Sequence, residues 1–253
     1  MYTETEGIVF RQTKIINGRR MILLFSRRYG KISAGTSVTE KGKGKAALAL
    51  RPFVYGRYDL AKTRENYFIN GGDVLRSHFA IGGDVDKYMA ASYIMELTEK
   101  LLPEEAPAPE LFSLLLDFLD AMEKRKQKFG TLVLAYQAKA LRSCGSFPRL
   151  DACVSCGGEE QLCAVGIKEG GALCKSCVPE IYENDRLIYN AEFDIVNILR
   201  FLSEQPLDKI AGLALEEGAE KTLRMLLSAW TEEYLGVGRL KSEGFFPEPE
   251  KSY

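Results

Sequence analysis

The chain has 253 residues, 46% of them hydrophobic and 27% charged, and its net charge is -1. These values are ordinary for a globular protein and exclude a fibrous or wholly disordered chain. No apolar run reaches the roughly 18 residues that a transmembrane helix needs, and the acidic residues 1–6 are unlike a secretory signal. We therefore expect a cytoplasmic protein without membrane contact.

The small net charge conceals an asymmetry along the chain. Residues 1–80 hold 15 of the 34 Lys and Arg residues but only 6 of the 35 Asp and Glu residues. Charge segregated in this way indicates that the first third of the chain meets a polyanion. The alternative is a solvated basic face that has no partner.

Residues 1–72 are predicted to be all-β. Five runs have the composition of strands, and turn signals such as Asn17-Gly18 separate them. The runs are Gly7–Phe10, Met21–Phe25, Lys31–Thr36, Phe53–Tyr58 and Asn66–Ile69. Five short strands suit a small closed barrel, which has no sheet edges. We expect an OB-fold over residues 1–80, with an SH3-like barrel as the alternative.

Basic and aromatic side chains alternate along these strands. Basic groups that follow a phosphate backbone, with aromatic rings that stack on bases, are the usual means of sequence-tolerant single-strand binding. Lysines and glycines alternate in 41–45, which indicates a flexible cationic loop; a plain solvated loop is the alternative. About half of the aromatic residues should fill the barrel. The candidate contacts are Lys14, Arg19, Arg20, Arg27, Arg28, Lys31, Lys41, Lys43, Lys45, Arg51 and Arg57, with Tyr29, Phe53, Tyr55, Tyr58 and Tyr67 as the aromatic set.

Residues 81–253 are predicted to form a helical domain, so the chain is α+β with two domains. Apolar residues recur at helical spacing, and Pro103–Pro109 is a linker with three prolines. These apolar stripes are interpreted as core. The predicted helices cover about 86–102, 110–126, 130–143, 191–204 and 216–235.

The segment 147–180 interrupts the helices and holds four cysteines spaced C-x2-C-x17-C-x2-C, namely Cys153, Cys156, Cys174 and Cys177. Two such knuckles supply four sulfurs to a tetrahedral Zn²⁺ and leave no open position for a substrate. The spacing therefore predicts a structural zinc site, with a redox dithiol or disulfides as alternatives. Cys144 and Cys163 are expected to be small buried residues.

Little in the sequence favours catalysis. The only histidine is His78, which argues against His-based triads and two-His metal centres; it is expected to be a packing or surface residue. The nucleotide-binding patterns GxxxxGK[ST] and GxGxxG do not occur. We therefore expect no enzyme and name no catalytic residue, although a zinc or thiol enzyme stays an alternative.

Several short motifs, taken in order, resemble one family over nearly the whole chain. They are Gly7-Ile8-Val9, Leu24-Phe25-Ser26, Tyr29-Gly30-Lys31-Ile32, Leu50-Arg51-Pro52-Phe53, Asp73-Val74-Leu75, Glu96-Leu97, the four cysteines with Gly157 and Gly170-Gly171, and Leu240-Lys241-Ser242. This set is similar to RecO, the bacterial recombination mediator. Each early motif alone is weak, but the ordered set is specific.

The resemblance implies an N-terminal OB-fold and a helical domain with a four-cysteine zinc element. It further implies binding of single- and double-stranded DNA, annealing of complementary strands, and partnership with RecR. Single-strand binding protein is a further partner that it implies, RecA is engaged indirectly, and binding of RecF stays open. An RNA-binding module built from an OB-fold and a zinc element is the alternative function.

Overall fold

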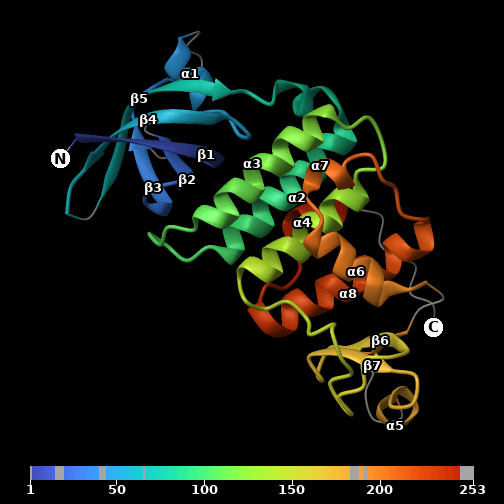
Figure 1. Ribbon diagram of the computed structural model, residues 1–253. Helices are drawn as coiled ribbons and strands as arrows, with labels where there is room; N and C mark the ends of the chain where they lie inside the picture. Colours follow the sequence, from blue (N-terminus) through green and yellow to red (C-terminus); the bar gives the residue numbers. More distant parts are fainter. Residues whose placement is uncertain are drawn as a thin grey trace. The chain divides into compact units, whose positions relative to one another are not determined.

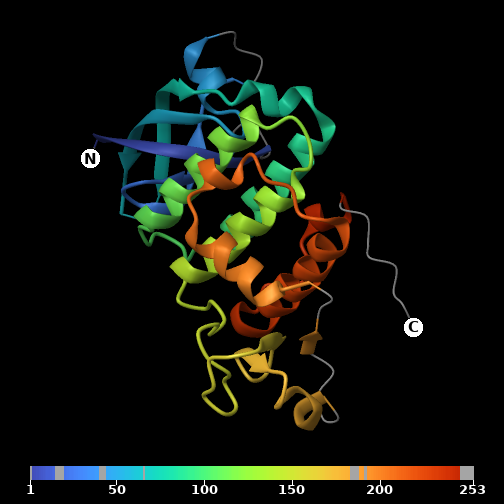
Figure 2. The ribbon, with the colours of Figure 1, turned by 45° about the vertical axis from the view of Figure 1, so that its right-hand side comes forward.

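The computed structural model describes residues 2–14, 20–39, 44–64, 66–182, 188–190 and 193–245. The chain divides into two compact units, Met1–Lys124 and Arg125–Tyr253, and each is described by itself. The element labels are those of Figure 1, and Figure 2 shows the same ribbon turned. None of the described helices combines the length and the hydropathy that crossing a membrane requires.

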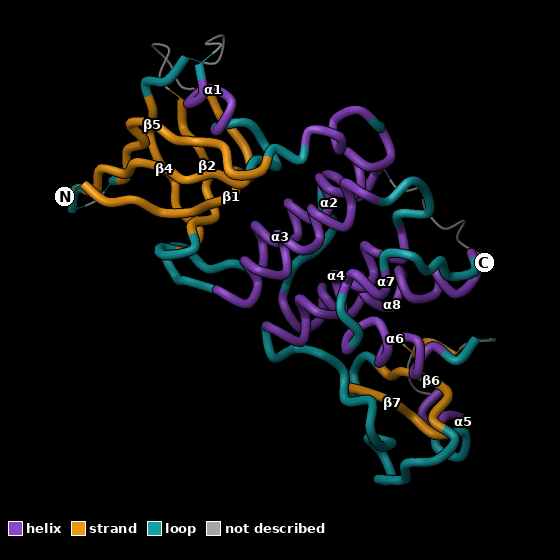
Figure 3. Tube along the Cα trace, turned by 45° about the horizontal axis from the view of Figure 1, so that its top comes forward, coloured by secondary structure: helices purple, strands orange, loops and turns teal. Residues whose placement is uncertain are grey.

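The first unit begins with a five-stranded barrel, closed in the order β1-β2-β3-β5-β4. Its strands, drawn in orange in Figure 3, are β1 (Tyr2–Lys14), β2 (Arg20–Ser26), β3 (Gly30–Thr36), β4 (Tyr55–Lys62) and β5 (Tyr67–Arg76). Neighbours are antiparallel except β3 and β5, which run parallel over Ala34–Thr36. A five-stranded barrel with this strand order has the architecture of an OB-fold. The predicted fold class is therefore confirmed.

Alternating residues of each strand fill the barrel, because successive side chains point to opposite faces. The interior consists of Val9, Ile22, Leu24, Ile32, Ala34, Tyr58, Leu60, Tyr67 and Ile69, joined by Ala49 and Leu50. These last two come from a short helix, α1 (Lys45–Ala49), and the turn after it. The Tyr58 hydroxyl donates to the carbonyl of Ala49 at 2.6 Å. This bond ties α1, which sequence analysis did not predict, to the barrel.

Part of the outer barrel surface is also apolar, and two helices cover it. These are α2 (Val85–Leu101) and α3 (Pro109–Lys124). The ring of Phe112 on α3 lies 5.1 Å from the ring of Phe25 and 6.1 Å from that of Tyr55. Packing therefore joins both helices to the barrel in one compact unit, Met1–Lys124, and the domain boundary expected at residue 80 stays a prediction.

The linker between α2 and α3 forms a backbone hydrogen bond to the barrel near the start of β3. The backbone N–H of Glu105 donates to the carbonyl of Lys31 at 2.9 Å, beyond the stretch where β3 pairs with β5. Gly30 has a φ of +70°, and a Cβ there would lie 2.1 Å from the carbonyl oxygen of Ala106. Only glycine permits both this conformation and this approach.

His78 is a packing residue, as expected, and it joins the barrel to α3. Its side chain is fully buried. Nδ1 lies 2.8 Å from the carbonyl oxygen of Phe53, and Nε2 lies 2.8 Å from Oδ1 of Asp120. The ring thus bridges the backbone of Phe53 to the carboxyl group of Asp120 on α3. Arg76 donates to the other oxygen of Asp120.

The second unit is helical and carries a small sheet. Its helices are α4 (Gly130–Ser143), α5 (Val178–Tyr182), α6 (Ile195–Glu204), α7 (Leu207–Ile210) and α8 (Glu217–Leu235), and its strands are β6 (Leu162–Gly166), β7 (Gly171–Cys174) and β8 (Ile188–Asn190). The described residues also include the short 3-10 turns η2 (Phe79–Gly83) in the first unit and η3 (Lys241–Phe245) in the second. Most of α4 is buried, so it forms the centre of the unit. The Trp230 indole donates to the carbonyl of Ser146 at 2.6 Å, which ties α8 to the segment after α4.

The five predicted helices are present with small changes at their ends. The helix expected from about 191 begins at Ile195, because the carboxylate of Asp194 accepts the backbone N–H of Asn197 and caps it. The helix expected to reach 126 ends at Lys124. Sequence analysis missed the hairpin of β6 and β7, since its strands are short and rich in small residues.

Replacement of Asp120 by Ala tests the junction between the barrel and α3. The change leaves Nε2 of the buried His78 without its hydrogen-bond partner, which costs about 1–3 kcal/mol. We expect faster amide hydrogen exchange in α3 and η2 and unchanged exchange in α8, measured peptide by peptide. The matched control is Asp151→Ala, an exposed carboxylate in the second unit. Equal protection of α3 in Asp120→Ala and the parent chain would contradict this role.

Candidate functional site

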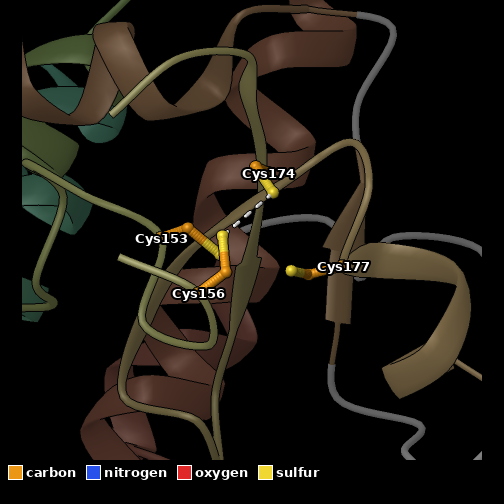
Figure 4. A group of neighbouring side chains, drawn as sticks. All are labelled: Cys153, Cys156, Cys174 and Cys177. Atoms are coloured by element: carbon orange, nitrogen blue, oxygen red, sulfur yellow. Dashed lines mark hydrogen bonds between the residues drawn. The ribbon is translucent and has the colours of Figure 1, made fainter. Parts of the chain in front are cut away.

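Four cysteine side chains of the second unit converge on one point, as Figure 4 shows. The sulfur atoms of Cys153, Cys156, Cys174 and Cys177 all lie within 4.8 Å of one another. The Cys156 and Cys174 sulfurs are 3.7 Å apart. Sulfurs bound at about 2.3 Å to a tetrahedral Zn²⁺ are about 3.8 Å apart, whereas a disulfide requires about 2.05 Å. The spacing therefore fits a four-coordinate metal ion and excludes a disulfide in this state.

Each pair of cysteines lies on a tight turn. In the first, the Gly157 N–H donates to the carbonyl of Cys153 at 2.8 Å, and the Cys153 N–H donates to the carbonyl of Gly158 at 2.7 Å. Gly157 has a φ of +78°, which favours glycine. The second turn follows β7 directly, and there the Cys177 N–H donates to the carbonyl of Cys174 at 3.0 Å. Two local turns thus aim four sulfurs inward.

The hairpin of β6 and β7 brings the two turns together. The Val154 N–H of the first turn donates to the carbonyl of Ala172 on β7 at 2.9 Å. From α8, the Tyr234 hydroxyl donates to the carbonyl of Ile167, at the hairpin turn, at 2.7 Å. The cluster therefore depends on a strand pair that holds residues about 20 positions apart in register.

Repulsion between neighbouring cysteine thiolates favours a bound cation at the cluster. Burial alone raises the pKa of the Cys153 thiol, but backbone hydrogen bonds from Cys156, Cys174 and Ser155 outweigh it and lower that pKa to about 6. At Cys177, a hydrogen bond with Ser155 lowers the pKa, yet bonds with Cys174 and Cys156 raise it to about 12. Without a metal, only part of the cluster ionises, since neighbouring thiolates repel. A divalent metal ion stabilises all four thiolates together.

The two remaining cysteines differ from each other. Cys144 is exposed at the end of α4, so the expectation that it is buried was wrong. Cys163, on β6, is half-buried and packs against the cysteine cluster. Burial raises the pKa of the Cys163 thiol, and the charges of Cys174 and Cys153 raise it further.

Several cationic candidates on the barrel already have partners. Arg20 is buried, and its guanidinium donates to the carbonyl of Val38 and, at 2.6 Å, to Oε1 of Gln12. Lys31 lies 3.1 Å from a carboxylate oxygen of Glu104 and donates to the carbonyl of Glu99. These contacts hold strands and helices together, so we leave Arg20 and Lys31 out of the surface offered to a ligand. Arg27 likewise pairs with Glu6 at 3.1 Å.

Other candidates remain open to solvent. Arg28 is exposed and donates to the hydroxyl of Thr3 at 3.1 Å. Within the described part of the chain, no ion pair forms at the exposed Lys45, Arg51 or Arg57. Arg57 stands in register between Glu6 and Asp73 on the neighbouring strands, which offset part of its charge. Arg19, Lys41, Lys43 and the side chain of Lys14 lie outside what the structure describes.

The aromatic candidates are more buried than expected. Phe53, Tyr55, Tyr58 and Tyr67 are all at most 9% exposed, and only Tyr29 is half-buried. Sequence analysis assigned about half of the set to the core. Tyr58 and Tyr67 lie in the barrel interior, while Tyr55 faces outward against Phe112. The core therefore takes most of these rings, and they are not available to stack on bases.

Phe68 is an exposed aromatic residue of the barrel that was not among the predicted contacts. It is 39% exposed and lies on β5 between the buried Tyr67 and Ile69. It pairs in register with Gly35 on β3, where an added Cβ would be only 3.2 Å from its ring. The ring thus lies over bare backbone on the outer face of β3, the side where OB-folds bind their ligands. Side chains point to alternate faces along a strand, so inward-facing Tyr67 and Ile69 place Phe68 on the outer face. This alternation was the signal that could have identified Phe68 from the sequence.

Removal of one sulfur tests the metal centre. We expect about one thiophilic metal ion per purified chain. Cys174→Ser should lower this content severalfold and speed hydrogen exchange in the β6–β7 hairpin, while the barrel strands keep their protection. Metal analysis and peptide-resolved exchange measure these effects, with Cys144→Ser as the matched control. A metal-free parent chain, or equal loss in the control, contradicts the assignment.

Two family models together match almost the whole chain. Residues 1–78 match the model described as Recombination protein O N terminal, and residues 82–244 match Recombination protein O C terminal. The first model covers the barrel, and the second covers the helices with the cysteine cluster between them.

Individual relatives agree with these matches along their full length. The chain is 27% identical over 250 residues to DNA repair protein RecO of Halalkalibacterium halodurans, covering 99% of this chain and 96% of that protein. It is also 27% identical to the protein of that name from Thermoanaerobacter sp., covering 96% of both chains. The same identity holds for that of Bacillus cereus strain AH187, covering 99% of both. With its OB barrel, four-cysteine cluster and full-length matches, the chain belongs to the RecO family of DNA repair proteins.

Proposed function

We propose that this chain is a recombination mediator that binds single- and double-stranded DNA and anneals complementary strands. It helps to load the recombinase RecA onto strands coated by single-strand binding protein, and RecR is its further partner. The observation that carries the proposal is the exposed Phe68 ring over Gly35 on the outer face of an OB barrel. An aromatic ring in this position stacks on unpaired bases of any sequence.

Exposed basic side chains supply the proposed contacts to the phosphate backbone. Lys45 is the first residue of α1, Arg51 follows that helix, and Arg28 lies in the turn between β2 and β3. Together with Arg19, Lys41 and Lys43, they form the basic set that follows the phosphate backbone in this proposal. The cations that α2 and its following linker neutralise, such as Lys31, take no part. The proposed contacts thus leave out the basic residues of the barrel that already pair with a carboxylate.

The cysteine cluster holds Zn²⁺ as a structural staple in this proposal. Four thiolates in tetrahedral spacing suit a soft divalent ion, and the four-sulfur set leaves no open coordination position for a substrate. The ion would stabilise the hairpin and the two knuckles of the second unit. The chain therefore acts by binding, without catalysis, in the bacterial cytoplasm and beside the nucleoid.

Charge reversal in the basic loop tests DNA binding. Lys41→Glu, Lys43→Glu and Lys45→Glu together should weaken DNA binding and flatten its dependence on salt, by about 0.7 in log–log slope for each lost single-strand contact. They should also slow annealing of complementary strands coated with single-strand binding protein. Lys126→Glu, Lys209→Glu and Lys221→Glu change the net charge equally in the second unit and serve as the control. Binding without a salt slope, or equal loss in both triple variants, would refute the basic surface.

Truncation of Phe68 tests base stacking. Phe68→Ala should cost about 1–3 kcal/mol in affinity for single strands and leave duplex affinity unchanged, measured by fluorescence anisotropy at constant salt. Phe79→Ala is the matched control, since that ring is 78% exposed outside the barrel. Competition with RNA of the same sequence distinguishes the alternative function. Strong preference for RNA would indicate recognition of the 2′-hydroxyl and would replace DNA as the ligand.

A further inference from the structure

Cys163 is a fifth cysteine beside the four-sulfur cluster. On β6, Leu162 pairs with Cys174 and Ala164 pairs with Leu173, so Cys163 is the extra residue of a β-bulge. The ladder continues on both sides of it, because the Lys175 N–H donates to the carbonyl of Gln161 at 3.0 Å. Cys163 is therefore held in the strand pair next to a metal-ligating cysteine.

The bulge lets Cys163 pack on the same side of the strand as its neighbours. Successive residues of a regular strand face opposite sides, yet Leu162, Cys163 and Ala164 all pack into the apolar group that contains Cys153 and Cys174. A bulge breaks the alternation and re-aims a side chain in this way. Two residues of a bulged strand face one residue of the partner strand, so Leu162 and Cys163 both lie beside Cys174.

The fifth thiol has no place in the coordination of the metal. Cys153, Cys156, Cys174 and Cys177 complete a tetrahedral set. Cys163 is half-buried, so a small oxidant such as hydrogen peroxide reaches this edge of the cluster. A spare thiol beside a zinc thiolate is suited to capture an oxidised sulfur before it is oxidised further.

We propose that Cys163 is the resolving thiol of a peroxide-responsive zinc site, a role that rests on the proposed occupancy by Zn²⁺. Hydrogen peroxide oxidises the Cys174 thiolate to a sulfenic acid and is itself reduced to water. The Cys163 sulfur then attacks the Cys174 sulfur, the S–S bond forms, the S–O bond breaks, and water leaves. Two thiols and one peroxide thus yield one disulfide and two waters.

The disulfide removes one of the four zinc ligands. Three thiolates hold the ion more weakly than four, so zinc dissociates and the hairpin with its two knuckles loosens. A dithiol reductant cleaves the bond, returns Cys174 to the cluster and restores zinc binding. Peroxide therefore controls the folding of the zinc element reversibly.

The test uses the full chain, whose zinc content is measured first. A chromogenic chelator then follows zinc release during peroxide treatment, and mass spectrometry of alkylated, unreduced peptides identifies the cross-link. In the parent chain we expect a Cys163–Cys174 disulfide and zinc release that dithiothreitol and added zinc reverse. In Cys163→Ala, release should slow severalfold, and what is released should no longer be recovered by the reductant. Cys144→Ala, which removes an exposed thiol at the end of α4, should behave like the parent.

Equal untreated zinc content in the parent and Cys163→Ala shows that the variant folds, and Cys163→Ser repeats the comparison if alanine lowers it. Release as fast and as reversible in both Cys163 variants as in the parent overturns the resolving role. A disulfide that joins two of the four zinc ligands overturns it as well. Absence of zinc from the untreated parent chain instead overturns the proposed zinc occupancy. The proposed release of zinc by peroxide is then refuted as well.

Discussion

The contact between Phe112 and the outer face of the barrel decides which surface of the first unit a ligand can reach. Phe25 and Tyr55 point out of the barrel and pack on this ring, because an apolar outer face needs a cover. The helices that provide it also bring carboxylates, such as Glu99, which pairs with Arg11. On this side of the barrel, the helices cover the apolar surface and their carboxylates offset the charge of basic residues. The side with Phe68 and the end with α1 keep their aromatic and cationic groups.

The second unit meets a different constraint, which is mutual repulsion in its cysteine cluster. Four thiolates within 4.8 Å of one another are stable together only around a cation. The local turns orient each pair, while the β6–β7 hairpin and Tyr234 hold the pairs against each other. The same hairpin carries Cys163 at its bulge, so the arrangement that builds the site also places a spare thiol beside it.

Most of the fold was predictable because its signals are local. Five strands, five long helices and the cysteine spacing each depend on residues close together in sequence, and the structure confirms them. The elements that were missed, among them α1, α5, α7 and the β6–β7 hairpin, are short and have little periodicity, so packing decides their conformation. The candidate contacts were less predictable. Arg20, for example, is of a residue type that usually lies on the surface. It is nevertheless buried, and its guanidinium donates a hydrogen bond to the carbonyl of Val38.

The sequence alone determined the four-cysteine motif, the barrel class and the excess of positive charge in residues 1–80, since spacing, alternation and composition need no long-range information. Only the tertiary structure decided which charges remain free, because their partners, such as Glu104 for Lys31, lie far along the chain. It likewise placed four aromatic rings in the core and left Phe68 outside. Burial depends on what packs on a residue, and that becomes known only when distant segments meet.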